Sequence, residues 1–351
     1  MQFSAWFRPS TVALAIGALR ATKHITPARL AHWWGPLDEP LPLPELQALL
    51  DRIIGVSSAR HPVKGHPDVN AIKREFGRQV AQDLDTGGPQ QALWSAHRMA
   101  SMDMRDSAAF QLYLGLVSLA NAETFTQLRA ALTAHVVMHL SCSQRIGRAQ
   151  ESCESFAAAE RQGVSQVIVI GSATQRCFSY DASTRVLTVP APDTYEQLPA
   201  KVVAAMFCFA LLGRVQAVLK VDDDHRLEQA PELMAAFRRV QSAAPVQMGR
   251  RTNIGVLGQH VRVWHFGKSA DPSLNDLPFS LPGTTRWLNG ASGYFLNHAA
   301  LRLLLWSHIY FPEYIRIGLY EDMTLSDLIE RQGGRLKITD MARVLATVDH
   351  Y

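Results

Sequence analysis

Short apolar runs of strand length alternate with helical segments from about residue 135 onward, and this alternation is the feature that most constrains the fold. The apolar runs are Val136–Leu140, Gln166–Ile170, Arg185–Val189 and Ala217–Val221. Two segments with helical features separate them, Arg145–Gln162 and Pro199–Leu212. Strands that alternate with helices usually form a mostly parallel sheet with helices on both faces. The sequence therefore predicts an α/β domain with a Rossmann-like, mixed but mostly parallel sheet.

The first 130 residues have a different pattern, in which apolar residues recur at helical spacing. Helices are expected over Leu43–Ile54, Val69–Leu84, Pro89–Met102 and Ala108–Ala120, with another that begins near Thr124. A chain of 351 residues is longer than one compact core usually holds. We therefore predict a helical N-terminal domain over residues 1–130 and an α/β domain over residues 131–351.

Composition narrows the classes of partner and location. Charged residues make up 19% of the chain and the net charge is only +4, which is too small to indicate nucleic-acid binding. The four cysteines form no CxxC pair, so we expect buried or half-buried thiols. No apolar run approaches the ~20 residues that a membrane-spanning helix needs. We expect a cytoplasmic protein, either free or peripheral at the inner face of the membrane.

The role of the helical N-terminal domain stays open between three alternatives. Residues Thr11–Leu19 form an apolar run that is either the first helix of a domain or a helix that lies on a membrane surface. Contacts with a partner protein or with another copy of the chain are the other two alternatives. The sequence does not decide among them.

An acidic triplet follows the fourth apolar run directly. Asp222, Asp223 and Asp224 come after Val221, where a predicted strand ends. Ligands of open α/β sheets bind beyond the carboxyl ends of strands. Three adjacent carboxylates repel one another unless a cation compensates them, and Mn²⁺ or Mg²⁺ is the cation that carboxylates prefer. The pattern is typical either of a metal site or of a solvated acidic turn.

A second acidic pair, Glu321 and Asp322, precedes an amphipathic stretch. Carboxylates at the start of a helix are stabilised by free backbone N–H groups and by the helix dipole, so capping is one interpretation. A general base that removes a proton from an attacking hydroxyl is the other.

Five segments, in this order, resemble those of the β-1,3-galactosyltransferase and Fringe family of inverting glycosyltransferases, which have the GT-A fold. They are an arginine segment with Arg145 and Arg148, the segment from Asp193 to Lys201, the run Val218–Asp224, the aromatic and glycine-bearing segment Trp287–Leu296, and Tyr320–Met323. The resemblance covers residues from about 135 to 350.

The resemblance implies a function and a set of roles. It implies transfer of a hexose or N-acetylhexosamine from a UDP-sugar to a sugar hydroxyl of a glycan acceptor, with a β-1,3 linkage. The alanine- and arginine-rich composition suggests a bacterial surface polysaccharide as that glycan. The implied roles are metal binding by Asp222, Asp224 and His350; nucleotide-sugar binding by Asp223, Arg145, Arg148 and Lys201; an acceptor side with Trp287, Gly293, Tyr294 and Glu321; and a catalytic base, Asp322.

The sequence also departs from the family pattern. Gln197 stands where asparagine is usual, and Ser326 stands where a glycine is usual. The acceptor-side segment lacks the usual prolines. These departures leave two alternatives open: a metal-dependent nucleotidyl or phosphoryl transferase that uses the same aspartates, and a catalytically inactive glycan-binding or scaffold protein. No P-loop motif is present, which argues against the first alternative.

Overall fold

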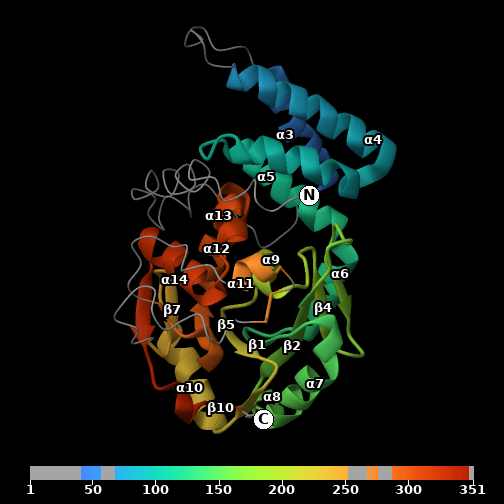
Figure 1. The fold of residues 1–351 in the computed structure, drawn as a ribbon. Coiled ribbons are helices and arrows are strands. Elements are labelled where there is room, and N and C mark those ends of the chain that lie inside the picture. Colours follow the sequence, from blue (N-terminus) through green and yellow to red (C-terminus); the bar gives the residue numbers. More distant parts are fainter. Residues whose placement is uncertain (1–40, 57–67, 252–266, 270, 276–286, 348–351) are drawn as a thin grey trace. The chain divides into compact units, whose positions relative to one another are not determined.

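The computed structural model describes residues 41–56, 68–251, 267–269, 271–275 and 287–347 (Figure 1). The chain separates into two compact units, with a boundary between Thr126 and Gln127. The apolar run Thr11–Leu19, for which a surface helix is one interpretation, lies outside the described residues.

The first unit is helical, as the spacing of its apolar residues predicts. Its helices are α3 (Leu43–Gly55), α4 (Val69–Ser101), α5 (Ser107–Ala120) and the start of α6 (Ala122–Ala131). Leu46 of α3 packs closely on Gly115 of α5. A Cβ added at Gly115 would lie only 2.3 Å from Leu46 Cδ2. This close approach explains a glycine in the middle of an otherwise apolar helix.

The two helices predicted over Val69–Leu84 and Pro89–Met102 are a single kinked element in the structure, α4. Gly88 adopts a left-handed backbone conformation with φ of 72°, and Pro89 follows it without a backbone N–H to donate. The turn signal Gly87-Gly88-Pro89 therefore marks a kink, and the helix resumes beyond it.

The second unit is built on one eight-stranded sheet, which confirms the prediction of a mixed, largely parallel sheet flanked by helices. The strands are β1 (His135–Leu140), β2 (Val164–Gly171), β3 (Ser179–Asp181), β4 (Val186–Val189), β5 (Ala217–Asp222), β7 (Val246–Gly249), β8 (Tyr294–Asn297) and β9 (Arg335–Ile338). Their order across the sheet is β3-β4-β2-β1-β5-β8-β7-β9. A separate two-stranded sheet pairs β6 (His225–Leu227) with β10 (Leu345–Thr347).

Strand β8 interrupts the parallel order of the sheet. Strands β4, β2, β1 and β5 are parallel neighbours, whereas β8 runs antiparallel to both β5 and β7. The start of β8 therefore lies beside the end of β5, where Tyr294 pairs with Lys220. This reversal brings the chain segment that precedes β8 to the edge of the sheet at which β5 ends.

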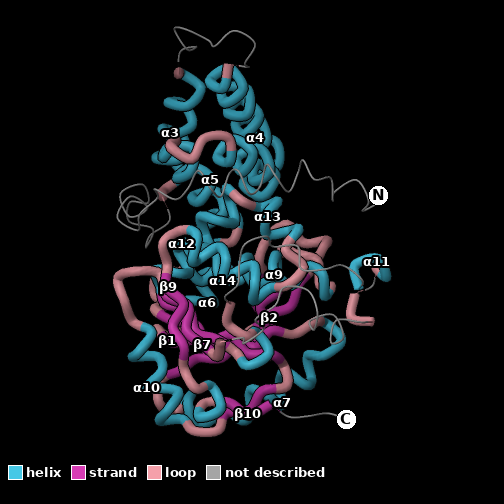
Figure 2. Tube along the Cα trace, turned by 60° about the vertical axis from the view of Figure 1, so that its left-hand side comes forward, coloured by secondary structure: helices cyan, strands magenta, loops and turns pink. Residues whose placement is uncertain are grey.

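Helices cover both faces of this sheet. Helices α7 (Ile146–Ser155), α8 (Ala157–Glu160) and α10 (Ala230–Val240) contact one another and strands of the sheet, and so do α9 (Leu198–Leu211), α12 (His298–Tyr310) and α14 (Glu321–Arg331). Figure 2 shows α7 and α10 on one side of the strands and α9, α12 and α14 on the other. The short helices α11 (Pro272–Asn275) and α13 (Pro312–Ile317) complete the unit.

Alternation along β5 sorts its residues between the two faces. Leu219 and Val221 join a buried cluster with Phe237 of α10 and Phe295 of β8. Lys220, between them, therefore faces the opposite side of the sheet. The predicted helix over Arg145–Gln162 is broken into α7 and α8 at Phe156, which is fully buried in the same cluster.

Candidate metal site and buried acid pair

The residues that follow β5 bring three potential metal ligands together. Asp222 is the last residue of β5, Asp224 lies in the turn after it, and His225 begins β6. One ligand atom from each of these three side chains lies within 4.8 Å of the others. The sequence pattern predicted Asp222 and Asp224 as ligands, and the structure places the two carboxylates together.

His225 was missed as a ligand, although it directly follows the triplet. Its imidazole is 1% exposed, and the Ser152 hydroxyl donates to its backbone carbonyl at 2.6 Å. The backbone N–H of Asp222 donates to its Nδ1 at 3.1 Å, and the carbonyl of Ala291 accepts from its Nε2 at 3.1 Å. These contacts fix the ring with Nδ1 on the side of the aspartates.

His225 Nδ1 also lies close to the acidic cluster, 3.3 Å from Asp224 Oδ1. Burial would raise the pKa of Asp224, but His225 and the charge of Arg148 hold it below its ordinary value. Two carboxylates and one imidazole form a donor set that divalent Mn²⁺ or Zn²⁺ accepts. The residues present therefore fit a divalent cation.

Asp223 points to a different set of partners. Leu140 of β1 and Asp222 of β5 are in register, so the next residues, Ser141 and Asp223, leave the sheet side by side. The Ser141 hydroxyl donates to Asp223 Oδ2 at 2.9 Å. Burial raises the pKa of Asp223, and this hydrogen bond and the nearby arginines offset only part of the rise. Asp223 is thus held by β1 and is not one of the three clustered ligands.

Arg148 of α7 reaches the same cluster from the side. Its Nη2 lies 3.3 Å from Asp224 Oδ2 and its Nε lies 3.6 Å from Asp223 Oδ1. The Nε is buried and has no hydrogen-bond partner among the described residues. Arg145, also predicted for the nucleotide side, acts on Asp223 only through its charge. Both arginines therefore lie near the aspartates, and Arg148 pairs with them directly.

Lys220 connects the aspartates to the second acidic pair. Its ammonium is 2% exposed and donates to Asp222 Oδ1 at 2.6 Å and to the carbonyl of Gly290 at 3.3 Å. Glu321 Oε2 lies 3.6 Å away, and the ring of Tyr294 lies beneath the ammonium at 5.6 Å. Burial alone would lower the pKa of Lys220, but Asp222 and Glu321 raise it above its ordinary value.

Glu321 begins α14 in a fully enclosed setting. The Tyr294 hydroxyl donates to its Oε1, and Lys220 faces its Oε2. Burial raises the pKa of Glu321 to about 7, although Lys220 and the tyrosine hydroxyl oppose the rise. Both carboxylate oxygens are already engaged by buried partners.

Asp322 is held by backbone groups instead. Its Oδ2 accepts the N–H of Gly290 at 2.9 Å, and its Oδ1 accepts the N–H of Met323 at 2.8 Å. Burial raises the pKa of Asp322, with these N–H groups and Lys220 opposing the rise. The N-cap of α14 is Tyr320, which makes no side-chain capping bond, and Asp322 lies within the first turn, where it accepts the N–H of the next residue. The bond from Gly290 comes from a distant loop and fixes the carboxylate in position.

The turn Gly290–Ala291 joins the two acidic groups. Gly290 donates to Asp322 and accepts from Lys220, and the carbonyl of Ala291 accepts from His225. A Cβ at Gly290 would lie 3.0 Å from both Asp322 Cβ and Glu321 Oε2, so only glycine fits there without displacement. This turn fixes the end of β5 against the start of α14.

The segment from Asp193 to Lys201 is hydrogen-bonded to the residues that follow β1 and β2 at this edge of the sheet. Lys201 is 2% exposed and donates to Asp193 Oδ1 at 2.8 Å and to the carbonyl of Ser141 at 2.7 Å. Asp193 also accepts from Ser143 and Gly171, which follow β1 and β2. Burial would raise the pKa of Asp193, yet the bond from Lys201 and these N–H groups hold it below its ordinary value. Lys201 is enclosed, whereas a direct nucleotide contact was predicted from the resemblance.

The residues predicted for the acceptor side are mostly enclosed as well. Trp287 is buried, and Tyr294 is fully buried with its hydroxyl on Glu321. The ring of Tyr294 is therefore packed within the fold and has no exposed face. Gly293 has a left-handed φ of 70° and lies against the carbonyl of Lys220. His350 lies outside the described residues, whose last member, Thr347, pairs with His225.

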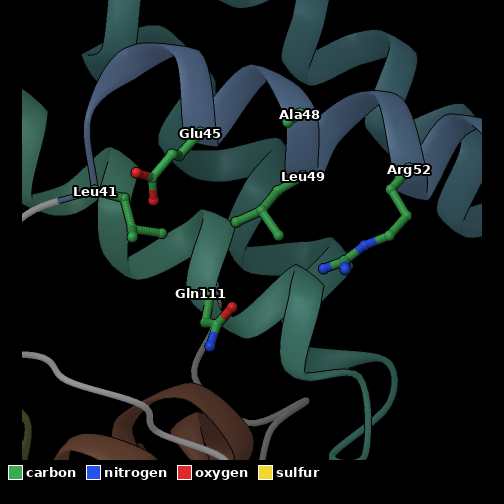
Figure 3. Close-up of a pocket in the computed structure, with 6 residues that line it drawn as sticks. All are labelled: Leu41, Glu45, Ala48, Leu49, Arg52 and Gln111. Atoms are coloured by element: carbon green, nitrogen blue, oxygen red, sulfur yellow. The ribbon is translucent and has the colours of Figure 1, made fainter.

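The described part of the helical unit contains a pocket of its own. Its volume is about 220 Å³, and it is lined by Leu41, Glu45, Ala48, Leu49, Arg52 and Gln111. Figure 3 shows these side chains around the exposed face of α3, with Glu45 toward one end and Arg52 toward the other. The lining is mixed in polarity and contains no cluster of potential metal ligands.

Two predictions about the chain as a whole can be compared with the structure. The four cysteines are unpaired and buried or half-buried, as expected. No helix in the described ranges combines the length and apolar character needed to cross a bilayer.

Comparisons with known proteins add no further assignment. The sequence matches no protein-family model, and no curated protein matches it. The fold established by the structure is a mixed, largely parallel α/β sheet flanked by helices, and the site at its edge is an Asp-Asp-His cluster that can hold a metal ion.

Proposed function

We propose that this protein is a metal-dependent inverting glycosyltransferase of the GT-A type that transfers a sugar from a UDP-sugar to a glycan hydroxyl. The observation that carries the proposal is the pairing of two acidic groups at one edge of the sheet. The cluster of Asp222, Asp224 and His225 is joined through Lys220 to the buried pair Glu321 and Asp322. Cation binding and proton removal are the two functions that such a transfer requires.

The first group suits the donor. Asp222, Asp224 and His225 would hold the cation, for which Mn²⁺ or Mg²⁺ is the candidate. When bound, the cation supplies Lewis-acid stabilisation of the charge that develops on a leaving diphosphate. Arg148, beside Asp224, is placed to contact the same phosphates.

The second group suits the acceptor. Asp322 is the better candidate for the base because each of its oxygens accepts one backbone N–H and keeps a free lone pair. Its raised pKa makes it a stronger base than an ordinary aspartate. Glu321, by contrast, is enclosed by Tyr294 and Lys220. We therefore assign proton removal from the acceptor hydroxyl to Asp322 and a positioning role to Glu321.

The metal cluster and the acid pair would serve glycosyl transfer and phosphoryl transfer alike, because an attacking hydroxyl needs a base in both. The resemblance of five segments to the inverting glycosyltransferases, and the lack of a P-loop motif in the sequence, support the choice of glycosyl transfer.

The test is release of UDP from a panel of UDP-sugars in the presence of Mn²⁺, with oligosaccharide acceptors. We expect release with one of the donors and none after chelation of the metal. Asp322→Asn should lower the transfer rate by about 10²- to 10⁴-fold while UDP binding is unchanged. Absence of both UDP binding and UDP release for every donor would exclude the proposed function.

Asp327→Asn is a poor control because Asp327 is buried in α14 and pairs with Arg331. Asp340→Asn is a better one, since that carboxylate is exposed. Its transfer rate should equal that of the wild type. Full transfer by Asp322→Asn would show that another group is the base.

A further inference from the structure

We infer that Arg148 holds the place of the metal ion in the free protein and thereby couples metal binding to diphosphate binding. This inference rests on the proposed function, because it concerns how the proposed metal and nucleotide sites act on each other. It assigns Arg148 two successive partners: Asp224 before the ligands bind, and a phosphate group afterwards.

The charges in contact at the cluster leave little attraction for a metal ion while Arg148 is in place. Asp222, Asp223 and Asp224 carry three negative charges, and Lys220 and Arg148, which contact them, supply two positive ones. These five groups therefore have one net negative charge, which attracts a divalent cation only weakly. A cation added to all five groups would leave a net positive charge in a half-buried site.

Of the two side-chain cations at the cluster, only Arg148 can move away from the aspartates. Lys220 is 2% exposed and bonded to Asp222 and Gly290, with Glu321 close to it. Arg148 is 28% exposed, and its contacts with Asp223 and Asp224 are 3.6 and 3.3 Å long. Its buried Nε donates no hydrogen bond to any described residue. Arg148 is thus held near Asp223 and Asp224 by the attraction between charges, and it makes no hydrogen bond to either carboxylate.

The guanidinium of Arg148 is chemically complementary to a phosphate group. A guanidinium binds phosphate oxygens through two parallel hydrogen bonds, which it does not make to Asp223 or Asp224 here. A diphosphate beside the metal site offers those oxygens. The metal favours the state in which Arg148 has left Asp224, and the diphosphate favours the same state. Each ligand therefore strengthens the binding of the other, and the effect is reciprocal.

The experiment measures the affinity for Mn²⁺ from the electron paramagnetic resonance signal of the free ion, with and without saturating UDP. Arg148→Met removes the charge and keeps most of the length of the side chain. Arg78→Met is the matched control, since Arg78 forms an exposed ion pair with Glu75 in the helical unit. Thermal unfolding of each variant shows that it is folded.

For the wild type, we expect UDP to raise the Mn²⁺ affinity by on the order of 10- to 100-fold. Arg148→Met should bind Mn²⁺ alone about fivefold or more tightly than the wild type, because a competing charge is gone. The effect of UDP should shrink in this variant by about fivefold or more. Arg148→Lys, which keeps the charge, should restore weak binding of Mn²⁺ alone.

The possible results distinguish failure of the inference about Arg148 from failure of the proposed function. A wild type that binds Mn²⁺ and UDP, with Arg148→Met equal to Arg78→Met in both measurements, overturns the inference and leaves the function standing. Weaker binding of Mn²⁺ alone by Arg148→Met also overturns it, since Arg148 would then orient Asp224. A wild type that binds neither ligand overturns both.

Discussion

His225 Nδ1 and Asp224 Oδ1 lie 3.3 Å apart at the end of β5. The other oxygen of this carboxylate, Oδ2, lies 3.3 Å from Arg148 Nη2. Burial would raise the pKa of Asp224, but His225 and Arg148 hold it below its ordinary value. The folded protein therefore favours the ionised form of Asp224.

We predict that Asp224→Asn weakens both metal binding and stability. The amide carries no charge to attract Arg148, so the free energy of unfolding of the metal-free variant should fall by about 0.5 to 1 kcal/mol. The Mn²⁺ affinity should fall by about tenfold or more, because a charged ligand is lost. Urea unfolding and metal titration measure the two quantities. With Asp340→Asn as control, a variant that keeps its metal affinity would contradict the prediction.

Glu321 should make the stability of the protein depend on pH near neutrality. Burial raises its pKa from 4.5 to about 7, so the folded state binds this proton more tightly than the unfolded chain does. The free energy of unfolding should therefore fall as the pH rises from about 4.5 to about 7, by about 3 kcal/mol in total, and stay level above that range.

Glu321→Gln removes this titration, and urea unfolding between pH 5 and pH 8 measures it. The slope between pH 5 and pH 7 should be smaller in Glu321→Gln than in the wild type. Glu330→Gln, an exposed position of the same helix, should keep the wild-type slope. Equal slopes in all three proteins would show that Glu321 is ionised throughout this range.

Gly293→Ala should be more destabilising than an equivalent change elsewhere. Gly293 has φ of 70°, and a Cβ there would lie 2.8 Å from Leu345 Cδ1 and 3.0 Å from the carbonyl of Lys220. Gly163 has a similar φ of 84°, but a Cβ there would meet nothing within 4 Å. Gly163→Ala and Gly293→Ala should each lower the free energy of unfolding by about 1 kcal/mol because of the backbone conformation. Gly293→Ala should lower it by about 1 to 3 kcal/mol more. Equal losses in urea unfolding would contradict the close approach.

Lys201→Met tests whether this lysine braces the site or binds the nucleotide. Removing one partner of a buried ion pair costs about 3 kcal/mol or more, whereas removing both costs less. We therefore expect Lys201→Met to be less stable than the double variant Lys201→Met with Asp193→Asn. UDP affinity, measured at a temperature at which the variants are folded, should match that of the wild type. A large loss of UDP affinity in a folded Lys201→Met would restore the nucleotide contact.

The sequence predicts well those elements whose signal is local. The buried parallel strands are continuous apolar runs, and the four expected strands all appear within two residues of their predicted limits. The strands β3, β6, β7, β9 and β10 were not predicted, since each has only three or four residues. Their positions depend on pairing with distant strands, which no local pattern records.

The residues of the candidate site likewise differ in how far a local sequence pattern predicts their roles. Asp222 and Asp224 are recognisable because they follow a strand directly, whereas His225 becomes a candidate only when the turn folds its ring back toward them. The enclosure of Tyr294 and Lys201 could not be predicted, because their partners lie 27 residues away at Glu321 and 60 residues away at Ser141. The resemblance of their segments to a glycosyltransferase family implied acceptor-side and nucleotide contacts for these two residues.

The reversed strand β8 also affects the order in which the site forms. Strands β1, β2, β4 and β5 come from residues 135 to 222 and pair among themselves. The bond between Lys220 and Gly290 spans 70 residues of sequence, and it forms only after β8 has inserted beside β5. Contacts of such separation form late and slowly in folding. During synthesis, the aspartates therefore emerge well before the turn that bonds to Asp322, so the Asp-Asp-His cluster and the acid pair become linked only when the later segment has joined the sheet.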